Sequence, residues 1–158
     1  MLSSISSIYD PDGTASAFLL EGRRILQEVT SEKQLGWYDY VPDHYIVRWS
    51  KWRKELLLLS DFEVPRCFKP KGFGKSVHTS LHTFSDASEK GYGKCSYLRQ
   101  VNKEGEIHAA LIMAKSRVTP LNQLITIPRL ELTALLTGAE IHSMLSEELN
   151  IEGLVGSF

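Results

Sequence analysis

The segment Val77–Val118 constrains the fold more than any other part of the chain. Apolar and polar residues alternate in three stretches of it, Val77–Ser85, Tyr92–Val101 and Ile107–Val118, and this alternation predicts three β-strands. The turn sequence NKEGE, residues 102–106, joins the last two stretches, so we expect them to form an antiparallel hairpin that pairs with the first strand. One face of the third strand is expected to carry Ile107, Ala109, Leu111 and Met113.

A long helix is expected after the strands. Pro128 stands where a helix tolerates proline, because the N–H that it lacks would have no partner in the first turn, and the helix is expected over Arg129–Leu149. The final segment, NIEGLVGSF, begins like another strand. A mixed sheet with a helix across it is an α+β fold of the α/β layer type. Such a partial sheet is also expected to leave an open strand edge, which invites association with other chains.

The N-terminal part is expected to be helical. Ser16–Lys33 alternates apolar and charged stretches near the 3.6-residue period, after the turn signal YDPDG. A second helix is expected from Tyr45 to about Leu59, with its two tryptophans in the core because an aromatic ring buries a large apolar area. The apolar stripe of this helix has steps of 4, 3, 4 and 3 residues and consists of Tyr45, Trp49, Trp52, Leu56 and Leu59.

A linker is expected between the helices and the strands. The segment Val64–Ser76 is rich in Pro, Gly and Lys, a composition typical of loops. The chain has 158 residues, enough for one domain or one and a half small ones. We therefore expect a helical connection segment over residues 1–76 and a second domain over residues 77–158.

Composition excludes several classes of protein. No apolar run approaches the ~20 residues that a membrane-spanning helix needs, so no membrane partner is expected. The N-terminus MLSSISSIYDPDG lacks the basic residue and the apolar core of a secretory signal. Cys67 and Cys95 have no zinc-like spacing, and we interpret them as free thiols in a reducing, intracellular compartment. The sequence indicates no oligomeric state.

Charge is unevenly distributed along the chain. The net charge is −4 over residues 1–43, +8 over residues 44–129 and −5 over residues 130–158. The middle part carries fifteen Lys and Arg against seven Asp and Glu. Such a basic part is compatible with a polyanionic partner, and the alternative is an ordinary solvated surface.

Two carboxylates are candidates for a metal site. Asp86 in TFSDASEKGYG ends the first expected strand, and Glu131 lies in the first turn of the expected helix. A helix that crosses back over the strands can bring these side chains together, and facing carboxylates repel unless a cation lies between them. Mg²⁺ or Mn²⁺ suits such oxygen ligands, and two ions ~3.5–4 Å apart can support phosphodiester hydrolysis. The alternatives are a turn-forming Asp and a Glu that stabilises the helix dipole.

Other polar residues are weaker candidates. His78 and His82 lie on one side of the first strand without a nearby third ligand, so metal binding by this pair is not expected. His142, in the middle of the long helix, is interpreted as a packed or surface residue. Lys115 and Arg117 precede the loop after the third strand and are interpreted as solvated, with a phosphate contact as the alternative.

Several motifs carry a resemblance to a known family. FSDASEKGYGKCSYL and AKSRVTPLNQLITIPRLELTALLTGAEI resemble the ribonuclease H region of BEL/Pao-type LTR retrotransposon polyproteins. SIYDPDG, LLEGRRILQEV, LGWYDYVP and RWSKWRKELLLLSDFEVPRCF resemble the segment of the same polyproteins that follows the reverse transcriptase palm. The resemblance covers nearly the whole chain, and PRLELTAL after AKSRVTP is its most specific part. The chain departs from the family at Asp12, where Leu is typical.

The resemblance implies a ribonuclease H-like fold. Enzymes with this fold cleave the RNA strand of RNA–DNA hybrids and use divalent metal ions for this reaction. It carries the family's first catalytic, metal-binding acid over to Asp86, and the helix acid to Glu131 in the pattern Glu-x-x-Ala completed by Ala134. The family's third acid belongs to a Thr-Asp-Ser at the end of the fourth strand, but the corresponding segment IEGLVGSF contains no Asp. Glu152 is the only replacement by position, because Glu140, nine residues after Glu131, faces the opposite side of the helix.

The sequence supports three interpretations of function. The first is a fragment of a retrotransposon polyprotein, from the reverse transcriptase and ribonuclease H region. The ancestral activity of this region is metal-dependent cleavage of RNA in RNA–DNA hybrids. The isolated chain is expected to be inactive. The second is a remnant that binds nucleic acid or protein without catalysis. The third is a degenerate product without a settled function. The missing third acid discriminates between the first two.

Overall fold

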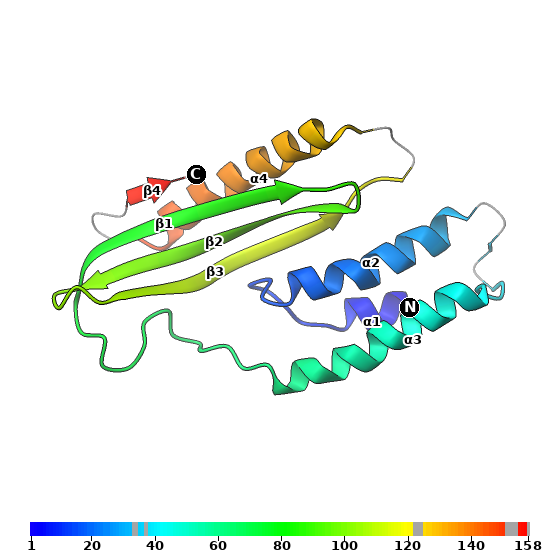
Figure 1. Ribbon diagram of the computed structural model, residues 1–158, viewed down its shortest axis with the longest axis horizontal. Helices are drawn as coiled ribbons and strands as arrows, with labels where there is room; N and C mark the ends of the chain where they lie inside the picture. Colours follow the sequence, from blue (N-terminus) through cyan, green and yellow to red (C-terminus); the bar gives the residue numbers. More distant parts are fainter. Residues whose placement is uncertain (33–34, 37, 122–124, 151–154, 158) are drawn as a thin grey trace.

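Two blocks of structure follow one another along the chain, a helical block and then a block of strands crossed by a long helix (Figure 1). The computed structural model describes residues 1–32, 35–36, 38–121, 125–150 and 155–157. Within these ranges no helix has both the length and the apolar character that a bilayer crossing needs. The elements in chain order are α1 (Leu2–Ser6), α2 (Ser16–Ser31), α3 (Asp43–Leu56), the 3₁₀ helix η1 (Leu57–Asp61), β1 (Ser76–Ala87), β2 (Gly91–Asn102), β3 (Ile107–Val118), α4 (Ile127–Glu148) and β4 (Val155–Ser157).

The strands form one mixed sheet in the order β3-β2-β1-β4. β1, β2 and β3 are an antiparallel meander, and β4 runs parallel to β1 beside Ser80–His82. In the β2–β3 turn, the side-chain oxygen of Asn102 accepts hydrogen bonds from the N–H groups of Glu104 and Glu106 at 3.1 and 2.8 Å. The α+β fold, the three expected strands and their hairpin turn are therefore confirmed. Of the expected final strand, residues 151–154 and 158 lie outside the described residues.

A bulge changes the faces of β3. Ser96 is paired with Met113, whereas the next residue, Tyr97, is paired with Leu111, so Ile112 is the extra residue between them. Ile112 is 5% exposed and lies in the core, whereas Ile107 is 61% exposed. The single apolar face expected for this strand was wrong, because a bulge interrupts the two-residue alternation.

α4 covers β1 and β2 on one face of the sheet (Figure 1). Its N-cap is Thr126, so the helix starts at Ile127, two residues before the expected start, and it ends at Glu148. Glu131 consequently lies in the second turn, and the placement in the first turn was wrong. The core between helix and sheet consists of Leu81, Leu98, Ile112, Ile141 and Leu145.

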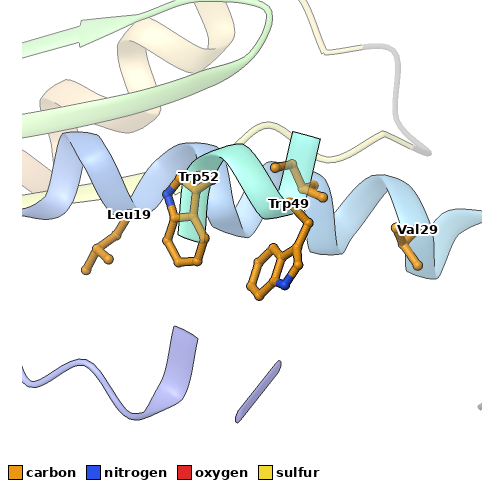
Figure 2. Close-up of a cluster of buried hydrophobic side chains, with 5 residues drawn as sticks. Leu19, Val29, Trp49 and Trp52 are labelled. Carbon is orange, nitrogen blue, oxygen red and sulfur yellow. The ribbon is translucent and has the colours of Figure 1, made fainter. Parts of the chain in front are cut away.

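α2 and α3 have a separate core (Figure 2). The rings of Trp49 and Trp52 lie side by side with centroids 4.8 Å apart, and Trp52 Nε1 donates a hydrogen bond to Phe18 O at 3.1 Å. Gly22 permits this packing, since a Cβ there would lie 2.5 Å from the Trp52 ring. The tryptophans are core residues, as expected, although α3 ends at Leu56 and the stripe continues on η1.

The segment between η1 and β1 has neither helix nor strand, as expected for the linker Val64–Ser76, except that Ser76 already belongs to β1. Its Phe73 is buried, and Phe73 O accepts a hydrogen bond from Asn102 Nδ2 at 3.0 Å. This contact attaches the linker to the β2–β3 turn. The division into domains at residues 1–76 and 77–158 stays a prediction.

The N-terminal segment covers part of the β3 edge. The N–H of Ala114 donates a hydrogen bond to Asp12 O at 2.7 Å, and Arg23 Nη1 donates to Ser116 O at 3.1 Å. These backbone groups would otherwise form an open edge that can pair with another chain. The expected open edge was therefore wrong for this part of β3, because α2 and the turn before it lie against the strand.

The turn before α2 is shaped for this contact. The Asp10 carboxylate accepts hydrogen bonds from the Thr14 hydroxyl at 3.1 Å and from the N–H of Ala15 at 3.2 Å, which confirms the expected turn and helix entry. Gly13 has φ +74°, and a Cβ added to it would lie 1.6 Å from Ala114 O. A side chain at position 13 would therefore push the N-terminal segment away from β3.

We predict that Gly13→Ala lowers the free energy of unfolding by about 2–4 kcal/mol, because it adds a steric clash to the strain of a positive φ. The matched control is Gly105→Ala, where φ is +82° but a Cβ would meet no atom within 4 Å. It should cost about 1 kcal/mol from strain alone. Urea unfolding followed by circular dichroism measures both, and equal losses would contradict the close approach.

Candidate active site

Asp86 is the penultimate residue of β1, opposite Gly93 of β2. Its side chain is exposed, and Oδ1 accepts a hydrogen bond from the N–H of Ala87 at 2.9 Å. Strand alternation turns Ser85 towards α4, because a Cβ on Gly138 of α4 would lie 3.9 Å from Ser85 Cβ. By the same alternation Asp86 is directed to the face of the sheet opposite α4, at the rim where the strand ends.

Glu131 is held next to this rim by α4. Ala134, one turn later, is fully buried against the sheet, whereas Glu131 is exposed. Asp86 and Glu131 line one open depression of about 430 Å³. The other residues that line it are Ser85, Pro128, Leu132 and Leu135.

The two carboxylates are chemically available. Within the described ranges neither Asp86 nor Glu131 forms an ion pair with a Lys, Arg or His. Mg²⁺ in proteins is commonly bound through one or two carboxylates, with waters completing its shell. The donor set therefore fits one such ion, with most of its ligands supplied by water or by a substrate phosphate.

A third protein ligand is not found in the described part of the chain. There, no group of three His, Cys, Asp or Glu side chains could hold a metal ion. The described residues of β4 lie level with Ser80–His82. His82 precedes Asp86 by four residues, roughly 13 Å along a strand. Glu152, the expected replacement, lies outside the described residues.

Asp86 also borders a second cavity, on the face of the sheet opposite α4. This cavity of about 450 Å³ lies between the N-terminal segment and the sheet, and its lining includes Leu20, Phe84, Tyr97 and Leu111. The rings of Phe84 and Tyr97 meet edge to face at 6.3 Å, and both side chains are partly exposed. Among the described residues that line this cavity, Asp86 is the one carboxylate.

A polar network connects α4 to the sheet. Thr83 Oγ1 is 3.0 Å from His142 Nδ1 and 2.9 Å from Ser96 Oγ, and Ser80 Oγ is 2.9 Å from His82 Nε2. The interpretation of His142 as a packed residue is confirmed. Burial, and then the charge of nearby His82, lower the pKa of His142. Sequence reasoning missed this network, because its members lie on different elements and share no motif.

The basic side chains near the depression include one that sequence reasoning did not single out. Lys94 Nζ donates a hydrogen bond to Thr137 O of α4 at 2.9 Å, so this lysine is partly buried between β2 and the helix. Lys115 and Arg117 are exposed on β3. His78 is exposed on β1.

The architecture and the position of the two acids define a class. The sheet combines an antiparallel meander with a strand parallel to β1, and a long helix crosses it. Acids lie at the end of β1 and near the start of α4. These features are consistent with part of a ribonuclease H-like domain. The family model for the Pao retrotransposon-like RNaseH-like domain matches residues 1–154. The chain therefore belongs to this family. Among curated proteins, no sequence matches it.

We predict that His142 makes stability depend on pH. Its lowered folded-state pKa means that the unfolded chain takes up the proton first, so the free energy of unfolding falls as pH drops below about 6.5 and levels off below the folded-state pKa. Urea titrations between about pH 7.5 and 5 should show a shallower fall for His142→Gln than for wild type. His78→Gln, on the exposed part of β1, is the control and should keep the wild-type slope. Equal slopes for all three proteins would contradict the assignment.

Proposed function

We propose that the chain is a ribonuclease H-like segment of a BEL/Pao-type retrotransposon polyprotein. The ancestral reaction is metal-dependent cleavage of the RNA strand in an RNA–DNA hybrid. The observation that carries this proposal is the placement of Asp86 and Glu131 around one depression at the end of the sheet. The family to which the chain belongs supports the same reaction class.

In this proposal Asp86 and Glu131 bind one Mg²⁺ or Mn²⁺ weakly. Such an ion supplies charge stabilisation for a phosphodiester oxygen and lowers the pKa of a bound water. The two residues contribute oxygen ligands from two elements that line the depression, Asp86 from β1 and Glu131 from α4.

We further propose that the isolated chain has little or no nuclease activity. A two-ion mechanism stabilises both the attacking and the leaving oxygen, and the second ion needs a further acid near Asp86. The family's third acid has no Asp counterpart in IEGLVGSF. Glu152 is the residue that could replace it.

A non-catalytic nucleic-acid-binding role is the second candidate. Its support is the net charge of +8 over residues 44–129. Binding of nucleic acid through this charge does not require a complete set of catalytic acids. Binding of this kind is independent of base sequence and weakens as salt rises, because phosphate contacts release counterions. The two candidates differ in whether the RNA strand is cut.

We predict that Mn²⁺ binds the chain with an affinity that depends on both acids. Asp86→Asn and Glu131→Gln should each weaken Mn²⁺ binding at least about tenfold, because each removes one of two charged ligands. Glu140→Gln removes an exposed acid from the same helix outside the depression and should leave the affinity unchanged. Electron paramagnetic resonance of free Mn²⁺ measures the affinity. Equal effects of all three substitutions would show that Mn²⁺ does not bind at the depression.

We predict that the chain does not detectably cleave a labelled RNA–DNA hybrid with Mg²⁺ or Mn²⁺. The assay compares wild type with Asp86→Asn and Glu152→Gln on a denaturing gel. Cleavage by wild type that Asp86→Asn abolishes would overturn the proposed inactivity. If Glu152→Gln also abolishes it, Glu152 completes the site. If Glu152→Gln has no effect, a group from a second chain completes it.

A further inference from the structure

The cavity between the N-terminal segment and the sheet has an aromatic floor. Phe84 is directly opposite Cys95, and Tyr97 is directly opposite Leu111. Residues directly opposite one another point to the same face of a sheet, and Cys95 and Tyr97 share a face because they are two positions apart on β2. All four residues line this cavity of about 450 Å³. It is called the α2–sheet cavity below.

The helical wall of the α2–sheet cavity is fixed against the sheet. α2 lies alongside β3 (Figure 1), and its Ala17 and Leu20 line the cavity. Ser116 Oγ donates a hydrogen bond to Ser16 O at 2.6 Å, and a Cβ on Gly91 would lie 3.0 Å from Leu20 Cδ2. The cavity is therefore preformed, and its volume lies within the roughly 300–1,000 Å³ that is typical of ligand sites.

The two aromatic rings of the floor are incompletely covered. Phe84 is 57% exposed and Tyr97 is 36% exposed, although the two rings meet edge to face at 6.3 Å. Aromatic rings pack favourably against a further ring in offset or edge-to-face geometry, and their faces attract cations. The floor is thus complementary to an aromatic group with a positive charge nearby.

Asp86 supplies the negative charge at the rim of the α2–sheet cavity. It is two positions after Phe84 on β1, so the two side chains point to the same face about 7 Å apart along the strand. Lys94 and Lys115 also line the cavity, but Lys94 Nζ donates its hydrogen bond to Thr137 O on the α4 side, and Lys115 is directly opposite Lys94. Within the described ranges Asp86 forms no ion pair. The charge that faces an occupant is therefore negative.

We propose that the α2–sheet cavity binds a small aromatic amine. The aromatic ring packs against Phe84 and Tyr97, and the ammonium group pairs with the Asp86 carboxylate. A chain of about two carbons between ring and nitrogen suits the spacing of Phe84 and Asp86 along the strand. Aromatic compounds without a positive charge lack the contact with Asp86 and bind more weakly.

Occupation of the α2–sheet cavity also affects the depression. Asp86 lines both, the cavity beside Phe84 and the depression beside Glu131. An ammonium group paired with Asp86 repels a divalent ion and occupies the oxygens that would bind it, so the amine and the ion compete. The competition rests on the proposed function, whereas the binding of the amine does not.

The test is isothermal titration calorimetry of the chain with tryptamine in EDTA, and with indoleacetate as an anion of similar shape. EDTA removes divalent ions, so failure of the metal proposal cannot imitate failure of this one. Tryptamine should bind at least about fivefold more tightly than indoleacetate, because repulsion by Asp86 replaces attraction in the anion. Equal affinities for the two compounds, or no binding of tryptamine, would overturn the proposal.

Two pairs of variants locate the binding. Asp86→Asn should weaken tryptamine binding about threefold or more, whereas Glu89→Gln, an exposed acid in the turn after β1, should leave it unchanged. Phe84→Leu should weaken it by a similar factor, because the ring contact and the attraction of the cation are lost. Phe68→Leu removes a ring that is 40% exposed in the linker and should have no effect. All four side chains are exposed, so the variants should keep the wild-type circular dichroism spectrum and melting curve. Equal effects within either pair would overturn the proposal.

Modification of Cys95 tests the location with the cavity lining unchanged. In a Cys67→Ser protein Cys95 is the remaining cysteine, and saturating tryptamine should slow its reaction with N-ethylmaleimide, measured by mass spectrometry. An unchanged rate would overturn the assignment to this cavity. Saturating tryptamine should also weaken Mn²⁺ binding in the resonance assay, and unchanged Mn²⁺ affinity would overturn the competition. Absence of Mn²⁺ binding by the wild-type chain, with tryptamine bound in EDTA, would contradict the metal proposal alone.

Discussion

The close packing of α4 on β1 is the contact on which the candidate site depends. Ala134 and Gly138 are buried at this contact, and a Cβ on Gly138 would lie 3.6 Å from Thr83 Cγ2. Because these residues are small, the helix lies near the strand, and it starts at the end of the sheet where β1 finishes (Figure 1). Glu131 is thereby carried to the depression that Asp86 also lines. A side chain larger than that of alanine at either buried position would move the helix, and the helix acid would move with it.

The helical block and the sheet are separate cores joined by polar contacts. One core forms around Trp49 and Trp52, the other between α4 and the meander. Between them, Asp12 O, Arg23 and Gln27 satisfy backbone groups of β3 and of the residue after it, with Gln27 Nε2 2.9 Å from Thr119 O. These contacts occupy hydrogen-bonding groups that a further strand would use, so the N-terminal block protects the sheet from edge-to-edge pairing.

Opposite charges are separated over a short distance at the end of the sheet. Asp86 and Glu131 line the depression, and Lys94, Lys115 and Arg117 lie on the neighbouring strands β2 and β3. Neither group is neutralised by an ion pair within the described ranges.

Local patterns in the sequence determined the elements. Alternation predicted the three strands, and the stripe around Trp49 and Trp52 predicted the core of α3, because both depend on neighbours a few residues apart. The Thr126 N-cap was also readable and would have placed Glu131 in the second turn. Asp86 and Glu131 were singled out from their places at a strand end and a helix start. Tertiary structure alone decided the bulge at Ile112, the cover on the β3 edge, and the meeting of Lys94 with Lys115 and of His142 with Thr83. The reason is that these contacts depend on strand register and on the path of the chain through space, which periodicity along the sequence does not encode.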